Sequence, residues 1–167
     1  QKARPDYTFL TEESGAIKGS DPDHRFIIDP IDGTMNFMHA VPVFAITVAL
    51  ERKNEIVAGV TYNPISDEMF TAEKGSGAFM NNRRIRVAAR RDIPDAMVSC
   101  SIPHRGRKDH ALARSEIGVM QGKVVGIRRL GSTCLELAYV AAGRFDATWQ
   151  RNVSPWDMAA GIALIRE

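Results

Sequence analysis

The chain has 167 residues and a formal net charge of +2, with 44% hydrophobic and 25% charged residues. This length and composition are ordinary for one globular domain with a substantial core. The sequence contains neither an apolar run of about 18 residues nor a basic and apolar leader, which argues against a transmembrane helix and a signal peptide. We therefore expect a cytoplasmic protein without a membrane partner.

The first predicted element is a short strand followed by two glutamates. Tyr7 to Leu10 is rich in β-formers, and Glu12 and Glu13 follow it directly. Paired glutamates at the end of a strand are most often simply exposed charge, so by themselves they indicate no function. The glycines, serine and proline between Gly15 and Asp23 predict a polar loop.

The sequence places its chemistry between Arg25 and Thr34. Phe26 to Ile28 lacks polar alternation, which is typical of a strand buried on both faces, and Pro30 should end that strand because it cannot donate to a ladder. Asp29 and Asp32 then follow on a turning backbone and can point at one site, where a cation would neutralise their repulsion. Oxygen-only ligands select a hard ion such as Mg²⁺. An ordinary turn explains the same residue types, and the local sequence leaves that alternative open.

An antiparallel meander is predicted after Thr34. The segments Val43 to Leu50 and Glu55 to Tyr62 are rich in β-formers and form a predicted hairpin. A further strand is expected over Glu68 to Ala72, and glycine and asparagine pairs punctuate two more short pieces. Gly75-Ser76-Gly77 lacks the lysine and the helix of a Walker motif, so it is not a phosphate loop.

Strands and helices alternate in the second half. The pattern predicts a strand over Met97 to Ser101, a helix over Lys108 to Met120 and a strand over Val124 to Leu130. We expect a single domain over residues 1–167, with a meander in about 1–101 and alternating elements in about 102–167.

Two further helices have recognisable starts. The first begins at Gly131-Ser132-Thr133, with Thr133 and Glu136 at the spacing of a capping box. Helix-start N–H groups also attract phosphate oxygens, so capping and substrate contact both stay open for Ser132 and Thr133. After a strand over Phe145 to Trp149, Ser154 and Pro155 open the last helix, where capping alone would explain Asp157.

The cysteines and the basic clusters carry weaker predictions. Cys100 and Cys134 lie in apolar surroundings without C-x-x-C spacing, which predicts buried free thiols. Basic residues cluster in four short runs that are typical of solvated faces or of a patch that attracts a phosphate ester. Because stacking aromatics are missing from them, nucleic-acid contact is kept as a minor hypothesis. The runs are Arg83–Arg86, Arg90–Arg91, Arg105–Lys108 and Arg128–Arg129.

The stretch Asp29-Pro30-Ile31-Asp32-Gly33-Thr34-Met35-Asn36-Phe37 resembles the D-P-[IL]-D-G-[ST]-x-N-F signature of the inositol monophosphatase family, Mg²⁺-dependent and lithium-sensitive phosphatases. Thr11-Glu12-Glu13-Ser14 is similar to the family's [GS]-E-E-S stretch, and Pro155 to Gly161 to its W-D-x-A-[AG]-[AG] motif. The resemblance implies a layered αβαβα sandwich, with family members continuing beyond both ends of this chain.

The resemblance also implies roles for individual residues. Thr34 would bridge toward Glu12 and orient the attacking water, so Glu12, Thr34 and Asp32 are the expected catalytic residues. The expected ligands of Mg²⁺ are Glu12, Asp29, Asp32, Asp157 and the carbonyl of Ile31. The expected substrate contacts are Asp32, Gly33, Thr34, Ser132, Thr133, Gln150 and Asp157. Gln150 stands where family members often carry a glutamate.

The ending Met35-Asn36-Phe37 resembles inositol monophosphatases and the bacterial extragenic-suppressor type. This implies hydrolysis of inositol monophosphate to inositol and phosphate by a metal-activated water, in a homodimer. Alternatives are a phosphatase for histidinol phosphate, a sugar phosphate or a nucleotide phosphate. A regulatory member that binds RNA or RNA polymerase is the alternative from another class.

Overall fold

A computed structural model describes residues 2–167, so the predicted domain begins one residue before the described part. Its larger sheet has eight strands. They are β1 (Thr8–Thr11), β2 (Gly15–Ile17), β3 (His24–Asp32), β4 (Ala45–Arg52), β5 (Glu55–Asn63), β6 (Glu68–Glu73), β7 (Gly77–Met80) and β8 (Arg83–Arg84). Their order is β2-β1-β3-β4-β5-β6-β7-β8.

The remaining elements build a second, smaller sheet and its helices. They are a 3₁₀ turn (Ile93–Asp95), β9 (Met97–Cys100), α2 (His110–Gln121), β10 (Gly126–Arg128), α3 (Thr133–Ala141), β11 (Ala147–Trp149) and α4 (Pro155–Arg166). The three strands are all parallel in the order β10-β9-β11. β9 thus belongs to the second sheet, although it precedes the expected division near residue 101.

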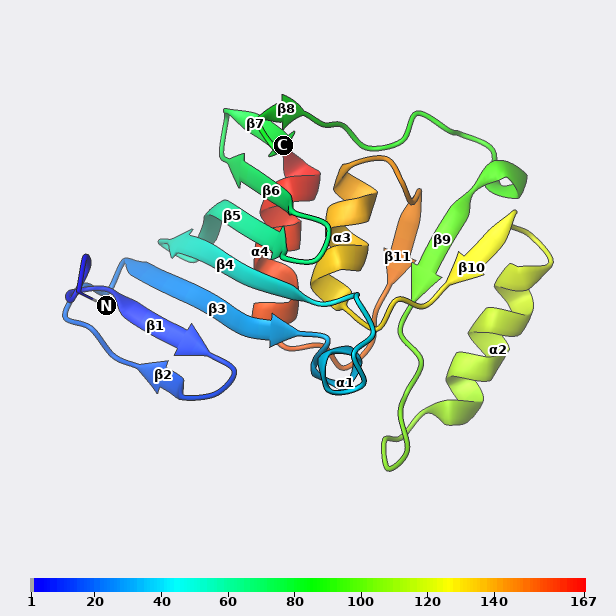
Figure 1. Ribbon diagram of the computed structural model, residues 1–167, viewed down its shortest axis with the longest axis horizontal. Helices are drawn as coiled ribbons and strands as arrows, with labels where there is room; N and C mark the ends of the chain where they lie inside the picture. The colour runs from blue at the N-terminus through cyan, green and yellow to red at the C-terminus, as the bar shows by residue number, and fades with distance from the viewer. Residues whose placement is uncertain (1) are drawn as a thin grey trace.

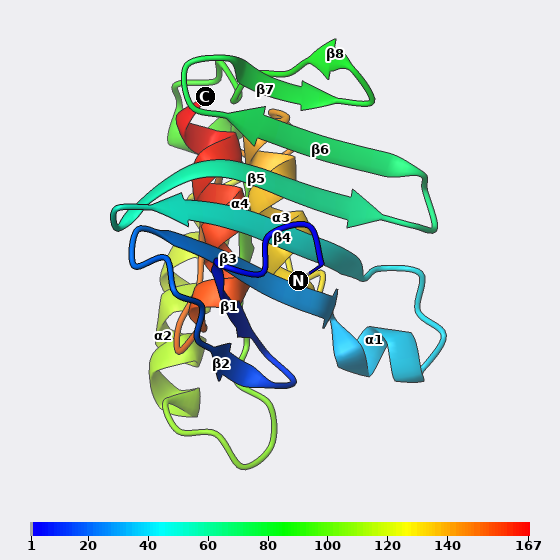
Figure 2. The same ribbon diagram turned by 90° about the vertical axis from the view of Figure 1, so that its left-hand side faces the viewer.

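The elements form four layers (Figure 1). The large sheet comes first, α3 and α4 lie behind it, the small sheet follows, and α2 lies on the far side of the small sheet. In Figure 2 the face of the large sheet that points away from the helices is toward the viewer, and α3 and α4 lie behind its strands. This layering confirms the predicted alternation of sheets and helices.

The predicted meander is confirmed from β3 to β8, where each neighbouring pair is antiparallel. In the β4–β5 hairpin, Lys53 and Asn54 both have positive φ and Arg52 pairs with Glu55. Two left-handed residues between paired ends match the twist of the strands, which is why a two-residue turn suffices here. β1 departs from the meander because it pairs in parallel with β3.

The expected end of the central strand was wrong. β3 continues past Pro30 to Asp32, and its register against β4 shifts between Asp29 and Asp32. Pro30 is tolerated because it lies in this irregularity, where a missing N–H breaks no ladder bond. β3 is also not equally buried on both faces, since Ile27 is buried and its neighbours are half-buried.

The core lies between the large sheet and the helices α3 and α4. Phe70 of β6 packs there with Ala138 of α3 and Leu164 of α4. A Cβ on Gly59 would come within 2.7 Å of the carbonyl oxygen of Ala160, so β5 can approach α4 closely only with a glycine there.

Besides the 3₁₀ turn at Ile93–Asp95, two short elements were not predicted. β2 pairs with β1 where a loop was expected, and α1 (Thr34–Met38) forms one helical turn directly after β3. Cys100 and Cys134 are buried free thiols, as predicted. None of the helices between residues 2 and 167 has both the length and the apolar character that a membrane crossing requires.

Candidate active site

Two of the predicted carboxylates lie at the end of β3, where the strand becomes irregular. Asp29 is 1% exposed and Asp32 is 8% exposed. An Asp29 oxygen accepts a hydrogen bond from the Ile31 N–H at 2.9 Å. One oxygen of Asp32 accepts from the Ser132 hydroxyl and, at 2.8 Å, from the N–H of Cys134. The irregular strand end therefore buries both carboxylates together.

Glu12 and Asp157 reach the same place from two other elements. β1 and β3 are parallel with Thr11 opposite Ile28, so Glu12 and Asp29 follow at one edge of the sheet. Asp157 lies in the first turn of α4 and accepts from the Ser154 N–H at 2.7 Å. The structure thus gathers all four predicted carboxylates from three chain segments.

Burial and mutual repulsion alter the acidity of this cluster. Burial raises the pKa of Asp29 to about 8, with Asp32 and then Glu12 adding to the increase. Burial raises the pKa of Asp32 to about 6, against hydrogen bonds from Ser132 and Cys134. Burial also raises the pKa of Asp157, which the Ser154 N–H opposes. The ion pairs within residues 2–167 all involve other carboxylates.

A divalent cation fits this donor set. Asp29 and Asp32 are buried side by side, Asp157 is half-buried and Glu12 is exposed. The charge of Glu12 acts on Asp29 and that of Asp157 on Asp32, and no cationic side chain among the described residues pairs with these four carboxylates. Cys134 lies beside Asp29 and Asp32, but burial raises the pKa of its thiol well above the usual value. Its sulfur lies 3.3 Å from the carbonyl oxygen of Asp157, to which the S–H donates. The available ligands are therefore oxygens, which suit a hard cation.

The turn after β3 holds Gly33 and Thr34. Gly33 precedes α1 with φ of 91°, and a Cβ there would lie 3.1 Å from the carbonyl oxygen of Val43 and 3.2 Å from that of Gly131. The exposed Thr34 hydroxyl donates to the Ile31 carbonyl at 3.0 Å. No hydrogen bond within residues 2–167 joins Thr34 to Glu12, so a role for Thr34 in orienting water stays a prediction.

The start of α3 corrects the predicted capping box. The cap is Ser132, whose hydroxyl oxygen accepts from the Leu135 N–H at 3.4 Å, and Thr133 is the first helical residue. Glu136 does not return to the helix start. Its carboxylate accepts from the Leu130 N–H at 2.7 Å and from the Gln150 amide at 2.5 Å, and these partners outcompete a cap contact.

A cavity of about 190 Å³ opens beside Asp157 and Thr133. Its lining includes His104, Arg107 and Arg151, which the sequence did not predict as site residues. The only signal for Arg107 was its place in a basic run, and no local pattern pointed to the others.

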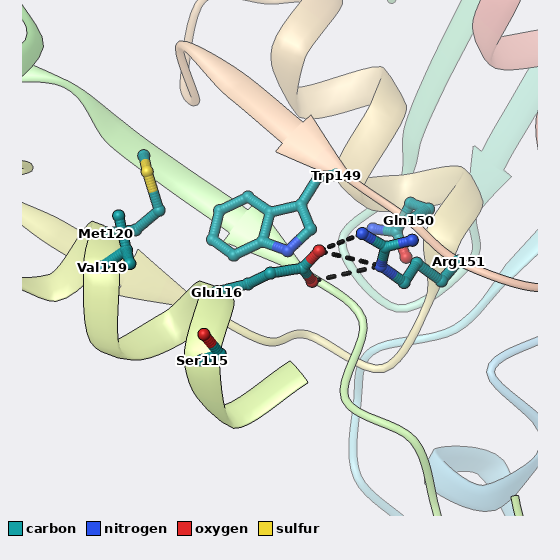
Figure 3. A pocket seen from close by; sticks show the side chains of 7 residues that line it. All are labelled: Ser115, Glu116, Val119, Met120, Trp149, Gln150 and Arg151. Carbon is teal, nitrogen blue, oxygen red and sulfur yellow. Dashed lines mark hydrogen bonds and ion pairs between the residues drawn. The ribbon is translucent and has the colours of Figure 1, made fainter. Parts of the chain in front are cut away.

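Gln150 lies apart from this cavity. It lines a different, largely apolar cavity of about 590 Å³ between α2 and the end of β11, beside Trp149 and Arg151 (Figure 3). The pair between Arg151 and Glu116 of α2 lies at the same place (Figure 3). In the part of the chain that the structure describes, Gln150 and Asp157 thus line two different cavities, and Arg151 lines both.

Asn36 is a further residue that sequence reasoning missed. Its amide donates to the carbonyl oxygens of Val43 at 2.7 Å and of Leu130 at 2.8 Å, which ties α1 to the loop before α3. Its only sequence signal was its place in the signature after Thr34.

A layered α/β fold with carboxylates gathered at strand and helix ends is typical of a metal-binding protein. A sequence model described as the inositol monophosphatase family matches residues 1–167, and the chain belongs to this family.

Individual relatives agree with the family match. The chain is 57% identical to an inositol-1-monophosphatase of Rhizobium meliloti over 99% of its own length and 62% of the relative's. It is 42% identical to the Nus factor SuhB of Pseudomonas aeruginosa over 100% of its length and 63% of the relative's. A crystal structure of the extragenic suppressor protein suhB from Bartonella henselae matches with a TM-score of 0.96 and 54% identity, over 99% of this chain and 64% of that one. The chain thus spans about three-fifths of the length of these relatives.

Proposed function

We propose that the protein containing this chain hydrolyses phosphate monoesters with the aid of Mg²⁺, and that inositol monophosphate is its substrate. The observation that carries the proposal is the buried pair Asp29 and Asp32, with the half-buried Asp157 and with Glu12 close by. These carboxylates have no cationic partner among the described residues. The relatives named inositol-1-monophosphatase support the choice of substrate.

The residues that would hold Mg²⁺ are Glu12, Asp29, Asp32, Asp157 and the Ile31 carbonyl. When bound, the ion acidifies a water molecule and stabilises the charge that develops on the phosphate and the leaving oxygen. The hydrogen bonds from Ser132 and Cys134 keep the Asp32 carboxylate in one orientation before any ligand arrives.

The chain's own groups position the reactants. The Thr34 hydroxyl, with its proton donated to the Ile31 carbonyl, has its oxygen free to accept from the attacking water. Glu12 then takes up the proton of that water. The backbone N–H groups after Asp32, at Gly33 and Thr34, bind phosphate oxygens.

The polyol part of the substrate occupies the cavity beside Asp157. Thr133 and Asp157 line this cavity and can accept hydrogen bonds from hydroxyl groups. Ser132, already engaged with Asp32, acts by holding that carboxylate. Direct contact of Gln150 with substrate remains a prediction from the family resemblance.

A screen of phosphate release tests the proposal. The complete protein would be assayed on inositol monophosphate, histidinol phosphate, sugar phosphates and nucleotide phosphates, with and without Mg²⁺ and with added Li⁺. We expect Mg²⁺-dependent, Li⁺-inhibited release, highest on inositol monophosphate. Faster release from another monoester would assign that compound as the substrate. Absence of release from every monoester would contradict the proposed function. The same preparation, run by sedimentation, tests the expected homodimer, and fractionation of cells tests the expected cytoplasmic location.

A regulatory role is the second candidate, because several relatives carry the name Nus factor SuhB. The basic runs of this chain supply exposed charge, as at Arg83 and Arg105, which could contact RNA or an RNA polymerase. Binding to either would be measured for the complete protein and for Asp29→Asn. Binding that survives this substitution would establish a role independent of hydrolysis.

A further inference from the structure

Glu136 is a buried carboxylate outside the acidic cluster. It lies in α3, is 2% exposed and accepts two hydrogen bonds, from the Leu130 N–H and from the Gln150 amide. Burial raises its pKa, and these two hydrogen bonds, that of Leu130 first, oppose the increase. Burying a carboxylate that has only neutral partners is costly, so a structural or functional reason for it must be found.

On one side, Glu136 fixes the loop before α3. Leu130 donates its N–H to Glu136 and accepts from the Asn36 amide through its carbonyl, so both polar groups of its backbone are held. Two residues later Ser132 binds Asp32. Thr133, next in the chain, lines the cavity beside Asp157.

On the other side, Glu136 fixes the end of β11. The Gln150 amide nitrogen donates to Glu136 and, at 2.8 Å, to Thr148. The next residue, Arg151, donates its N–H to the Ser101 hydroxyl at 3.1 Å. Residues 151–153 then form part of the lining of the cavity beside Asp157.

We propose that Glu136 is a positioning residue for the substrate cavity, because its buried carboxylate joins the loop 130–133 to the strand end 150–153. These two segments lie about twenty residues apart in the chain, and they contribute Thr133 and residues 151–153 to one cavity lining. This inference rests on the proposed function, in which that cavity receives the polyol. Among the described residues, no hydrogen bond joins Glu136 to the acidic cluster.

Substitutions at Glu136 and Gln150, including an exchange of the two side chains, test this contact. In Glu136→Leu, neither the Leu130 N–H nor the Gln150 amide has an acceptor. In Gln150→Glu, two carboxylates face each other. In the double variant Glu136→Gln with Gln150→Glu, a donor again faces an acceptor. We expect each single variant to raise KM for inositol monophosphate about tenfold, and the double variant to restore it to within about twofold of wild type.

Asp146 provides a matched control. Its carboxylate also accepts from a backbone N–H, that of Met97 at 2.8 Å, and from a side chain, that of Arg90. It joins β9 to the start of β11, away from the cavity. Asp146→Asn should lower the melting temperature without changing KM. An unchanged KM in Glu136→Leu, or no recovery in the double variant, would overturn the proposal.

Amide hydrogen exchange tests the positioning role of Glu136 independently of any activity assay. In the complete protein, Glu136→Leu should speed exchange in both 128–133 and 150–153, whereas Asp146→Asn should leave both segments unchanged. Exchange that is unaltered by Glu136→Leu would reject the positioning role even if the enzyme is active. If wild type releases no phosphate, the proposed function fails and the exchange result alone decides the role of Glu136.

Discussion

The Asp157 carboxylate has two possible roles, as a helix cap and as a ligand of the cation. One oxygen accepts from the Ser154 N–H and so closes the first turn of α4. The same carboxylate lies near Asp32, whose pKa its charge helps to raise. Sequence alone favoured the cap, since Ser154, Pro155 and Asp157 are ordinary helix-start residues. The structure retains the cap and adds the acidic neighbours, so both tasks can coexist.

Asp157→Asn separates these two tasks. Asparagine is itself a good capping residue, so a cap alone should lose about 1 kcal/mol or less of unfolding free energy. If Asp157 binds the cation, the Mg²⁺ concentration for half-maximal turnover should rise sharply. The melting temperature in chelator should stay level or rise, because one repelling charge is gone. An unchanged Mg²⁺ titration would leave Asp157 with the cap alone.

Thr34→Ala tests the proposed role of Thr34 in orienting the attacking water. Its hydroxyl follows the paired aspartates and points its proton at the Ile31 carbonyl. We expect kcat to fall about 100-fold with little change in KM, because only the chemical step uses this group. Thr34→Ser keeps the hydroxyl and should retain most of the turnover. A rise in KM alone would make Thr34 a substrate-binding residue instead.

The residues that sequence could identify are those in contiguous motifs. Asp29, Asp32 and Asp157 were each found from neighbours within a few positions, and the structure brings them together. Glu136 was misread as part of a helix cap because its true partners, Leu130 and Gln150, become neighbours only after folding. Local sequence carries no record of such contacts.

At the scale of elements, the end of β3 decides where the carboxylates point. Proline predicted that the strand would stop, and the structure instead absorbs Pro30 in a shift of register between β3 and β4. A bulge depends on the partner strand, so a reading of one strand could not predict it. The predicted hairpin of β4 and β5 succeeded because its signals are local.

Gly33→Ala tests whether the turn after β3 must be this tight. The added Cβ would meet the carbonyl oxygens of Val43 and Gly131, in addition to the strain of a positive φ. We expect a loss of about 2–3 kcal/mol in urea unfolding and a large loss of turnover. Gly75→Ala is the control, since Gly75 has φ of 80° but open space around it. Its loss should be about 1 kcal/mol, with unchanged turnover. Equal effects of the two substitutions would show that steric closeness at Gly33 is unimportant.

At the scale of the whole molecule, the sequence predicted the layered architecture better than the pairing of strands within the large sheet. Periodicity distinguished the meander from the alternating half, and the family resemblance supplied the sandwich. The parallel pairing of β1 with β3, which places Glu12 beside Asp29, joins strands that are separated in sequence by β2 and has no local signal. The motifs therefore identify the individual carboxylates, and only the fold shows that they lie together.

The stability of the whole molecule should depend on the cation. A ligand that binds only the folded state stabilises it, by about 2.7 kcal/mol at 100 times its Kd. Scanning calorimetry of the complete protein in chelator and then in Mg²⁺ should therefore show a rising melting temperature. Na⁺ at equal ionic strength separates binding from screening of the carboxylates. An equal rise in Na⁺ would mean that screening, not a bound ion, relieves the cluster.

The most direct test of the central claim measures phosphate release from inositol monophosphate by the complete protein across a Mg²⁺ titration. Wild type and Asp29→Asn would be compared at equal folded concentration. We predict that wild type turns over only with Mg²⁺ and that the substitution, which removes one charge from the buried cluster, reduces turnover by orders of magnitude. Full Mg²⁺-dependent turnover in Asp29→Asn would contradict the claim that these carboxylates hold the catalytic cation.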